Sequence, residues 1–138
     1  MGTTTSLREL IAGQFNWAGW EALIRENGIT LDRPYRTPHP DYPEIIYPIN
    51  YGYVNGTTST DGDEVDVFVG SVESGLVGLL MTTDFGRGDR EIKLLYNCTP
   101  EEIYLANGFV NFDRQRMEGT LALRRPMRAL WVSGSLHE

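Results

Sequence analysis

The sequence is poor in the residues on which several common kinds of site depend. Cys98 is the only cysteine among 138 residues, so neither an internal disulfide nor a zinc site made of thiolates can form. This excludes a secreted domain held together by disulfides. Basic residues are also scarce, because 12 lysines and arginines face 19 acidic residues and the formal net charge is −7. Nucleic acid is therefore not expected as a partner, since binding it electrostatically needs an excess of positive charge.

Long apolar runs are lacking too. The longest, residues 76–81, is interrupted by Gly78 and is far shorter than the roughly 20 residues that cross a bilayer. Residues 1–7 have no basic stretch followed by an apolar one, which a secretory signal would need. We therefore expect a cytoplasmic protein without a membrane partner.

Length and composition predict a single folded domain over residues 1–138. The chain is 41% hydrophobic and 22% charged, which is ordinary for a globular protein. Neither an internal repeat nor a linker interrupts it. We divide it into a helical N-terminal segment (residues 1–28), a proline-rich loop (29–48), a barrel core (49–96), and a helix with closing strands (97–138).

Three helix starts carry capping signals. Ser6 and Glu9 have the spacing of a capping box. A second start is expected at Asn16, after which apolar residues recur at helical spacing until Asn27-Gly28 stops the helix. A third helix is expected to begin at Thr99, with proline and two acidic residues in its first turn, and to end near residues 106–108.

Strand-like segments fill most of the remaining chain. The prolines of residues 29–48 forbid a helix and limit any strand there to a sheet edge. Short runs rich in Val, Leu, Ile and Tyr predict strands at residues 49–54, 65–69, 76–83, 92–96, 120–123 and 127–132. Evenly spaced short strands favour a small barrel, so we predict a mainly β member of the α+β class with helices packed outside.

Acidic residues are densest in Thr60-Asp61-Gly62-Asp63-Glu64-Val65-Asp66. A turn at Asp61-Gly62 allows three carboxylates to converge at the mouth of the following strand. Two like charges 4 Å apart repel by about 4 kcal/mol at an effective dielectric of 20, so convergence is costly without a cation. Oxygen ligands suit hard ions such as Mg²⁺ or Mn²⁺. The alternative is a solvated acidic turn.

A second acidic pair makes the metal interpretation more attractive. Asp84 and Asp89 flank a glycine-rich hairpin that places both at one edge of the sheet. Alternation along the second strand puts Glu91 and Lys93, the only lysine, on the same face. The alternative for Lys93 is an exposed charge on an edge strand.

Together these motifs resemble the soluble, metal-dependent inorganic pyrophosphatase family. The matching features are Tyr-Pro-Ile-Asn-Tyr-Gly-Tyr at residues 47–53, the Asp-x-Asp-x-x-Asp that begins at Asp61, and the pair Asp84 and Asp89. The resemblance covers about residues 47–95. It implies a closed OB-like β-barrel with an acidic cavity, a homo-oligomer, and Mg²⁺-dependent hydrolysis of a small phosphate substrate, pyrophosphate, to two phosphates.

The resemblance also implies roles for individual residues. The metal ligands would be four aspartates: Asp61, Asp66, Asp84 and Asp89. Asp63 would take a proton from the water that the metals activate. Tyr51 would hydrogen-bond the leaving phosphate, and Arg33 and Lys93 would bind phosphate.

Departures from the family's pattern keep other functions open. Glu91 stands where the family has a lysine, and no lysine follows residue 93. The phosphate charge would then have to be neutralised by Arg33, Arg36, His39, Lys93 or the late arginines. A wider cavity favours another phosphoanhydride, such as a nucleotide, while Glu91 favours a non-enzymatic metal- or phosphate-binding module. A single-strand binder that stacks bases on Tyr51, Tyr53 and Phe68 is disfavoured by the acidic charge.

Overall fold

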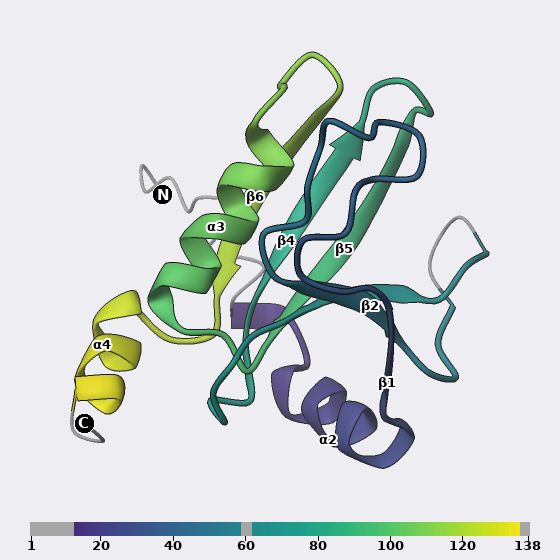
Figure 1. Ribbon diagram of the computed structural model, residues 1–138. Coiled ribbons are helices and arrows are strands. Elements are labelled where there is room, and N and C mark those ends of the chain that lie inside the picture. Colours follow the sequence, from purple (N-terminus) through teal and green to yellow (C-terminus); the bar gives the residue numbers. More distant parts are fainter. Residues whose placement is uncertain (1–12, 59–61, 136–138) are drawn as a thin grey trace, which may run out of the picture.

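The chain folds into one mixed sheet with helices on both faces (Figure 1). The computed structural model describes residues 13–58 and 62–135. The elements, in chain order, are α2 (Trp17–Asn27), β1 (Ile29–Arg33), β2 (Asn50–Val54), β3 (Val65–Val69), β4 (Leu76–Asp84), β5 (Asp89–Tyr96), α3 (Pro100–Asn111), β6 (Met117–Leu123) and α4 (Met127–Ser135). Within the described ranges, no helix combines the length and the apolarity that crossing a bilayer requires.

Alternation along the central strands builds two cores, one on each face of the sheet. Successive side chains of a strand point to opposite faces. Accordingly, Val67, Leu79 and Leu94 pack in a cluster with Trp17 and Ile24 of α2, whereas Phe68, Leu80 and Leu95 pack in a cluster with Ile103, Ala106 and Val110 of α3. The face under α3, here called the α3 face, carries the polar groups described below.

The sheet is open, so the closed OB-like barrel that we expected is wrong. The strand order is β1-β2-β3-β5-β4-β6, in which only β3 and β5 run parallel. Closure would require β1 to pair with β6, but β1 pairs with β2 alone and β6 with β4 alone among the described strands. The register of β1 shifts between Leu31 and Arg33, and its three central residues are exposed. A short, irregular edge strand of this kind does not close a barrel.

The signals at the ends of α2 are confirmed. The Asn16 side chain caps the helix by accepting a hydrogen bond from the Gly19 backbone N–H at 3.1 Å. At the other end, Gly28 adopts a φ of 78° and its N–H donates to the Ile24 carbonyl at 2.8 Å. A residue with a side chain rarely takes that φ, which explains why glycine ends this helix. The capping box expected at Ser6 and Glu9 lies outside the described residues.

The capping box of α3 is present as the sequence predicts. The Glu102 N–H donates to the Thr99 hydroxyl at 3.1 Å, and the Thr99 N–H donates to Glu102 Oε1 at 2.9 Å. The same Oε1 accepts from the Ser71 N–H at 3.1 Å, which ties the helix start to the end of β3. The helix runs on to Asn111, beyond the end expected near residues 106–108, because Gly108 does not interrupt it.

Replacing Thr99 with alanine is expected to lower the free energy of unfolding by about 1 kcal/mol, the usual cost of losing a helix cap. Urea unfolding followed by tryptophan fluorescence measures the change. Thr99→Ser is the control, because it keeps the hydroxyl and should retain most of the stability. Equal losses in both variants would mean that the hydroxyl does not stabilise the helix.

Two segments differ from their predicted structure. Residues 127–132 were expected to form a strand, but they begin α4, where Ala129 N–H bonds the Pro126 carbonyl. Proline suits the start of a helix, and Met127 and Leu130, three residues apart, both pack on the α3-face core. The strand β1 lies in the segment expected to be a loop. It ends at Arg33, directly before the first proline of that segment, and forms one edge of the sheet.

Candidate active site

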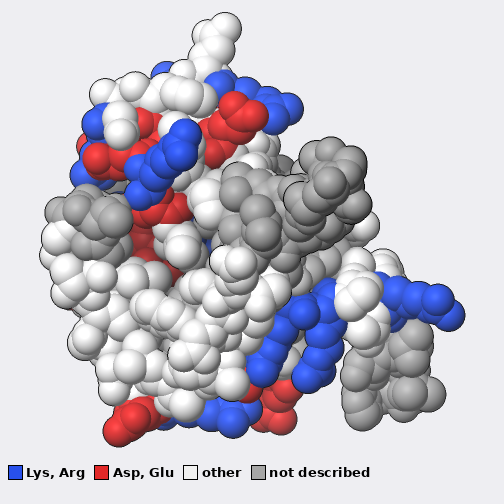
Figure 2. Space-filling model, turned by 180° about the vertical axis from the view of Figure 1, so that it is seen from behind, with Lys and Arg blue, Asp and Glu red and all other residues white. Residues whose placement is uncertain are grey.

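A cavity of about 810 Å³ opens on the α3 face of the sheet. It lies at the end of the molecule where the β1–β2 loop, the β4–β5 turn and the α3–β6 turn meet (top of Figure 1). Its acidic lining residues are Asp32, Asp41, Asp63, Asp66, Asp84, Glu91 and Asp113. Its basic lining residues are Arg33, Arg87, Lys93 and Arg116. On the face drawn in Figure 2, acidic atoms lie deep in a hollow, and basic side chains stand at its rim.

The strand pattern explains why carboxylates from three strands meet there. Each of Asp66, Asp84, Glu91 and Lys93 lies an even number of residues from a strand residue of the α3-face core. Residues separated in this way share a face of the sheet. Asp66 and Lys93 are also direct partners across the parallel β3–β5 pair. The polar groups therefore continue the apolar core toward solvent along the same strands.

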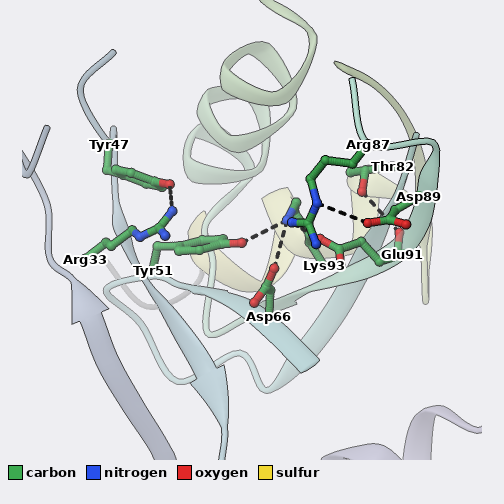
Figure 3. A network of polar contacts seen from close by, with 9 residues as sticks. All are labelled: Arg33, Tyr47, Tyr51, Asp66, Thr82, Arg87, Asp89, Glu91 and Lys93. Atoms are coloured by element: carbon green, nitrogen blue, oxygen red, sulfur yellow. Dashed lines mark hydrogen bonds and ion pairs between the residues drawn. The ribbon is translucent and has the colours of Figure 1, made fainter. Parts of the chain in front are cut away.

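Lys93 connects these groups (Figure 3). Its ammonium donates to the Tyr51 hydroxyl at 2.8 Å, to Asp66 Oδ2 at 2.9 Å and to Glu91 Oε1 at 3.1 Å. Lys93 is only 6% exposed. Because an ammonium has three donors, all of its hydrogen-bonding capacity is used within this cluster. The alternative of an exposed edge charge for Lys93 is wrong, because it lies on a central strand in the interior.

The surroundings of Lys93 and Tyr51 fix the charge states of these two residues. Burial alone would lower the pKa of Lys93, but Tyr51 and the carboxylates of Asp66 and Glu91 raise that pKa well above its usual value. Burial raises the pKa of the Tyr51 phenol well above its usual value. The site therefore contains a charged ammonium held between two carboxylates, next to a neutral phenol.

A second group of contacts lies on the other side of Tyr51 (Figure 3). The Arg33 guanidinium donates a hydrogen bond to the Tyr47 hydroxyl. Its central carbon lies 5.5 Å from the Tyr47 ring centroid and 5.8 Å from that of Tyr51. These contacts hold a cation at the cavity wall, where it can bind an anion.

The β4–β5 turn separates the two aspartates that flank it. Asp84 lines the cavity, and its Oδ1 accepts from the N–H groups of Gly86 and Arg87 at 3.0 and 3.1 Å. Asp89 is paired with Asp84 across the hairpin, but its carboxylate lies 3.2 Å from Arg87 Nε and is not part of the cavity lining. The expected position of both at one sheet edge is thus observed, with only Asp84 facing the cavity.

Most of the residues singled out from the sequence come together. The cavity lining includes Asp63, Asp66, Asp84, Tyr51, Arg33, Lys93 and His39. Arg36 lies outside it, with its guanidinium 5.1 Å from the Tyr35 ring. Asp61 lies outside the described residues. Within residues 13–58 and 62–135, no three carboxylate, histidine or cysteine side chains are arranged to hold a metal ion.

Several residues that line the cavity were not singled out from the sequence, among them Tyr47 and Arg87. Tyr47 was noted only as part of a motif, yet it positions Arg33. Its spacing from Tyr51 was a usable signal, because residues four apart in an extended segment share a face. Arg87 lines the cavity from the middle of a turn, where no periodicity could indicate its direction.

His39, which lines the cavity, makes the stability of the fold depend on pH. Burial lowers the pKa of its imidazole, Arg33 and Arg116 lower it further, and Asp41 and Glu44 oppose the change. The unfolded chain therefore binds this proton more readily, so protonation of His39 destabilises the fold as the pH falls through about 6.5.

We expect an NMR titration to place the midpoint of His39 below 6.5, with its signal identified by its absence in His39→Gln. The wild type should also lose more stability than this variant between pH 7 and pH 5. A midpoint above 6.5 would contradict the assigned surroundings.

The sequence matches the family model described as inorganic pyrophosphatase over residues 25–94. It is 47% identical over 57 residues to an inorganic pyrophosphatase of Haemophilus ducreyi and 33% identical over 84 residues to inorganic pyrophosphatase 1 of Pseudomonas syringae pv. tomato. These alignments cover 35% and 54% of this chain. They span 33% and 45% of the relatives, so less than half of each relative is matched.

A solved structure supports the fold independently. The chain superposes on the crystal structure of an inorganic pyrophosphatase from Neisseria gonorrhoeae with a TM-score of 0.50 and 15% sequence identity. The superposition covers 78% of this chain and 81% of the other. At that identity the likeness concerns the fold alone. The family model, in contrast, matches half of the sequence and includes most of the cavity's strand residues. The chain therefore belongs to the inorganic pyrophosphatase family.

Proposed function

We propose that this chain hydrolyses pyrophosphate to two phosphates and requires a divalent cation, Mg²⁺ or alternatively Mn²⁺. The observation that carries the proposal is one cavity that joins carboxylates of β3, β4 and β5 to Arg33 and Lys93. Membership of the family supports pyrophosphate as the substrate. Because the matched segments span less than half of the curated relatives, the activity is a proposal for this chain.

The donor set of the cavity suits a hard cation. Asp66, Asp84 and Glu91 present only oxygen atoms, which Mg²⁺ and Mn²⁺ prefer. Acidic residues also outnumber basic ones in the lining, so a polyanion can bind only together with cations. We assign Asp66 and Asp84 as ligands, with Asp61 as a further candidate. Asp89 remains a candidate only if it leaves Arg87.

Three residues of the chain are assigned separate roles in the hydrolysis. Bound divalent cations would neutralise phosphate oxygens and acidify the attacking water. Asp63, at the cavity mouth, is assigned as the base that takes the water's proton. Arg33 is assigned to a phosphate oxygen. Tyr51, a neutral phenol, is assigned to the leaving phosphate.

Lys93 is better suited to positioning than to contact with phosphate. Its three donors already bind Tyr51, Asp66 and Glu91, so a phosphate could reach it only by displacing one of them. We therefore assign Lys93 to holding Tyr51 and Asp66 in place. Its predicted direct contact with phosphate stays a prediction.

Phosphate release by the full chain tests the proposed function. With pyrophosphate and Mg²⁺ we expect turnover, with excess chelator we expect none, and added Mg²⁺ should restore it. Release that is unaffected by the chelator would contradict the metal requirement. If neither Mg²⁺ nor Mn²⁺ supports turnover but both raise the melting temperature, the chain is a metal-binding module that has lost the activity.

The proposal includes a cytoplasmic location and self-association. Exposed apolar side chains on two helices, Tyr104 and Leu105 on α3 and Trp131 on α4, support a contact between copies. Sedimentation equilibrium should then give a multiple of the 15.6 kDa chain mass. The single-chain mass at all concentrations would contradict self-association.

A further inference from the structure

Exposed aromatic side chains form part of the cavity lining. Tyr42, Phe85 and Phe112 are 39%, 50% and 68% exposed, and all three line the cavity together with Arg116. These four residues are here called the aromatic rim. They come from the three connections that meet at this end of the molecule: the β1–β2 loop, the β4–β5 turn and the α3–β6 segment.

Contacts between the connections hold the rim together. The Arg116 guanidinium carbon lies 4.1 Å from the Tyr42 ring centroid, which joins the β1–β2 loop to the α3–β6 turn. The Phe85 N–H donates to the Arg116 carbonyl at 2.9 Å, which joins the same turn to β4–β5. The His39 ring lies 5.2 Å from the Tyr42 ring, tilted by 44°, and stacks on the Tyr47 ring at 6.2 Å. Tyr42, Phe85 and Arg116 are therefore connected, and Phe112 lines the same cavity.

Local structure does not account for the two phenylalanines. The β4–β5 turn is held by Asp84, which accepts from two backbone N–H groups, and this needs no aromatic side chain at Phe85. Phe112 ends α3 with helical dihedral angles, and most of its ring is exposed rather than packed in a core. Exposed aromatic groups gathered at a cavity are typical of a binding site.

Pyrophosphate alone leaves this rim without a role, because it is a polyanion with no apolar surface. A phosphoanhydride that carries an aromatic group would use both parts of the cavity, its phosphates among the carboxylates and basic groups and its ring on the rim. Nucleobases stack on aromatic and guanidinium groups without needing a particular base. The volume of about 810 Å³ lies within the range of pockets for small organic ligands.

We propose that the cavity accepts a nucleoside diphosphate, with its base stacked on the aromatic rim and its diphosphate where pyrophosphate would lie. This inference rests on the proposed function and names a wider substrate class for the same site. In the reaction, the oxygen of water bonds to the terminal phosphorus and the bond from that phosphorus to the bridging oxygen breaks. The nucleoside monophosphate leaves with that oxygen and its electron pair, and water releases a proton.

Two ligands that cannot be hydrolysed at the bridging position distinguish the affinity due to the aromatic rim from the affinity due to the phosphate-binding part of the cavity. The full chain is titrated calorimetrically, with Mg²⁺ present, with α,β-methylene adenosine diphosphate and with methylenediphosphonate. Both contain the same bridge, but only the first carries a base. We expect the nucleotide analogue to bind about tenfold more tightly, as stacking of one base allows.

Substitutions in the aromatic rim test whether the rim causes the higher affinity for the nucleotide analogue. Phe85→Ala with Phe112→Ala should weaken the nucleotide analogue about tenfold and change methylenediphosphonate affinity less than twofold. Tyr35→Ala is the control, because Tyr35 is 55% exposed and carries a stacked arginine but lies outside the cavity. It should leave both affinities unchanged.

The outcomes distinguish this inference from the proposed function. Equal affinities for both ligands, or rim variants that bind the nucleotide analogue like the wild type, would overturn the inference and leave pyrophosphate hydrolysis intact. Binding of neither ligand would overturn both. Rim variants that change the chain's association in size-exclusion chromatography, while nucleotide affinity stays the same, would show that the rim contacts another copy instead.

Discussion

Turnover of pyrophosphate is expected to fall by about two to four orders of magnitude in Asp63→Asn, the range that a positioned general base contributes. Asp63 is exposed and lines the cavity mouth, so an amide of the same shape should not disturb packing. The amide cannot accept the water's proton at neutral pH. Phosphate release under saturating Mg²⁺ measures the loss, and circular dichroism checks the fold.

Glu64→Gln is the matched control for this variant. Glu64 neighbours Asp63 and is also exposed, but it does not line the cavity. Glu64→Gln removes the same amount of charge from the same turn as Asp63→Asn does. Turnover within a few fold of wild type is expected. Equal losses in the two variants would assign the effect to the charge of the turn and remove Asp63 from the role of base.

Lys93→Met should lower the free energy of unfolding by about 3 kcal/mol. Breaking a buried ion pair by removing one partner costs about 3–5 kcal/mol, because the other charge stays in the interior. The lower end applies here, since the side chains of Asp66 and Glu91 are 28% and 16% exposed and retain some contact with water. Urea unfolding measures the change.

Arg114→Met provides the comparison. Arg114 pairs with Glu118 at 2.8 Å, but both side chains are largely exposed, and such pairs contribute about 0–1 kcal/mol. We therefore expect a much smaller loss of stability for Arg114→Met than for Lys93→Met. Similar losses would mean that Lys93 is no more important to the fold than a surface charge.

Local signals predicted most of the elements, and tertiary context decided the rest. Asn16, Gly28 and Thr99 act through hydrogen bonds and dihedral angles within a few residues, which the sequence displays directly. The openness of the sheet could not be predicted, because it depends on which edge strands meet. Residues 127–132 were misassigned because so short an apolar run carries no clear period, although Pro126 before it was a usable helix signal.

In the candidate site, too, local patterns predicted some features and contacts between distant residues decided the others. Alternation correctly placed Glu91 and Lys93 on one face, since both lie on a regular strand. It could not reveal that the ammonium binds three partners, because one of them, Tyr51, is 42 residues away in the chain. Asp89 matched the family pattern, but its carboxylate pairs with Arg87 and does not line the cavity.

Anomalous diffraction from crystals grown with Mn²⁺ and methylenediphosphonate tests whether the carboxylates of β3 and β4 hold the cations that bind the substrate. We predict manganese peaks beside the carboxylates of Asp66 and Asp84, with the diphosphonate between them and Arg33. Manganese bound only on the outer surface, or a diphosphonate bound away from these strands, would contradict this metal site.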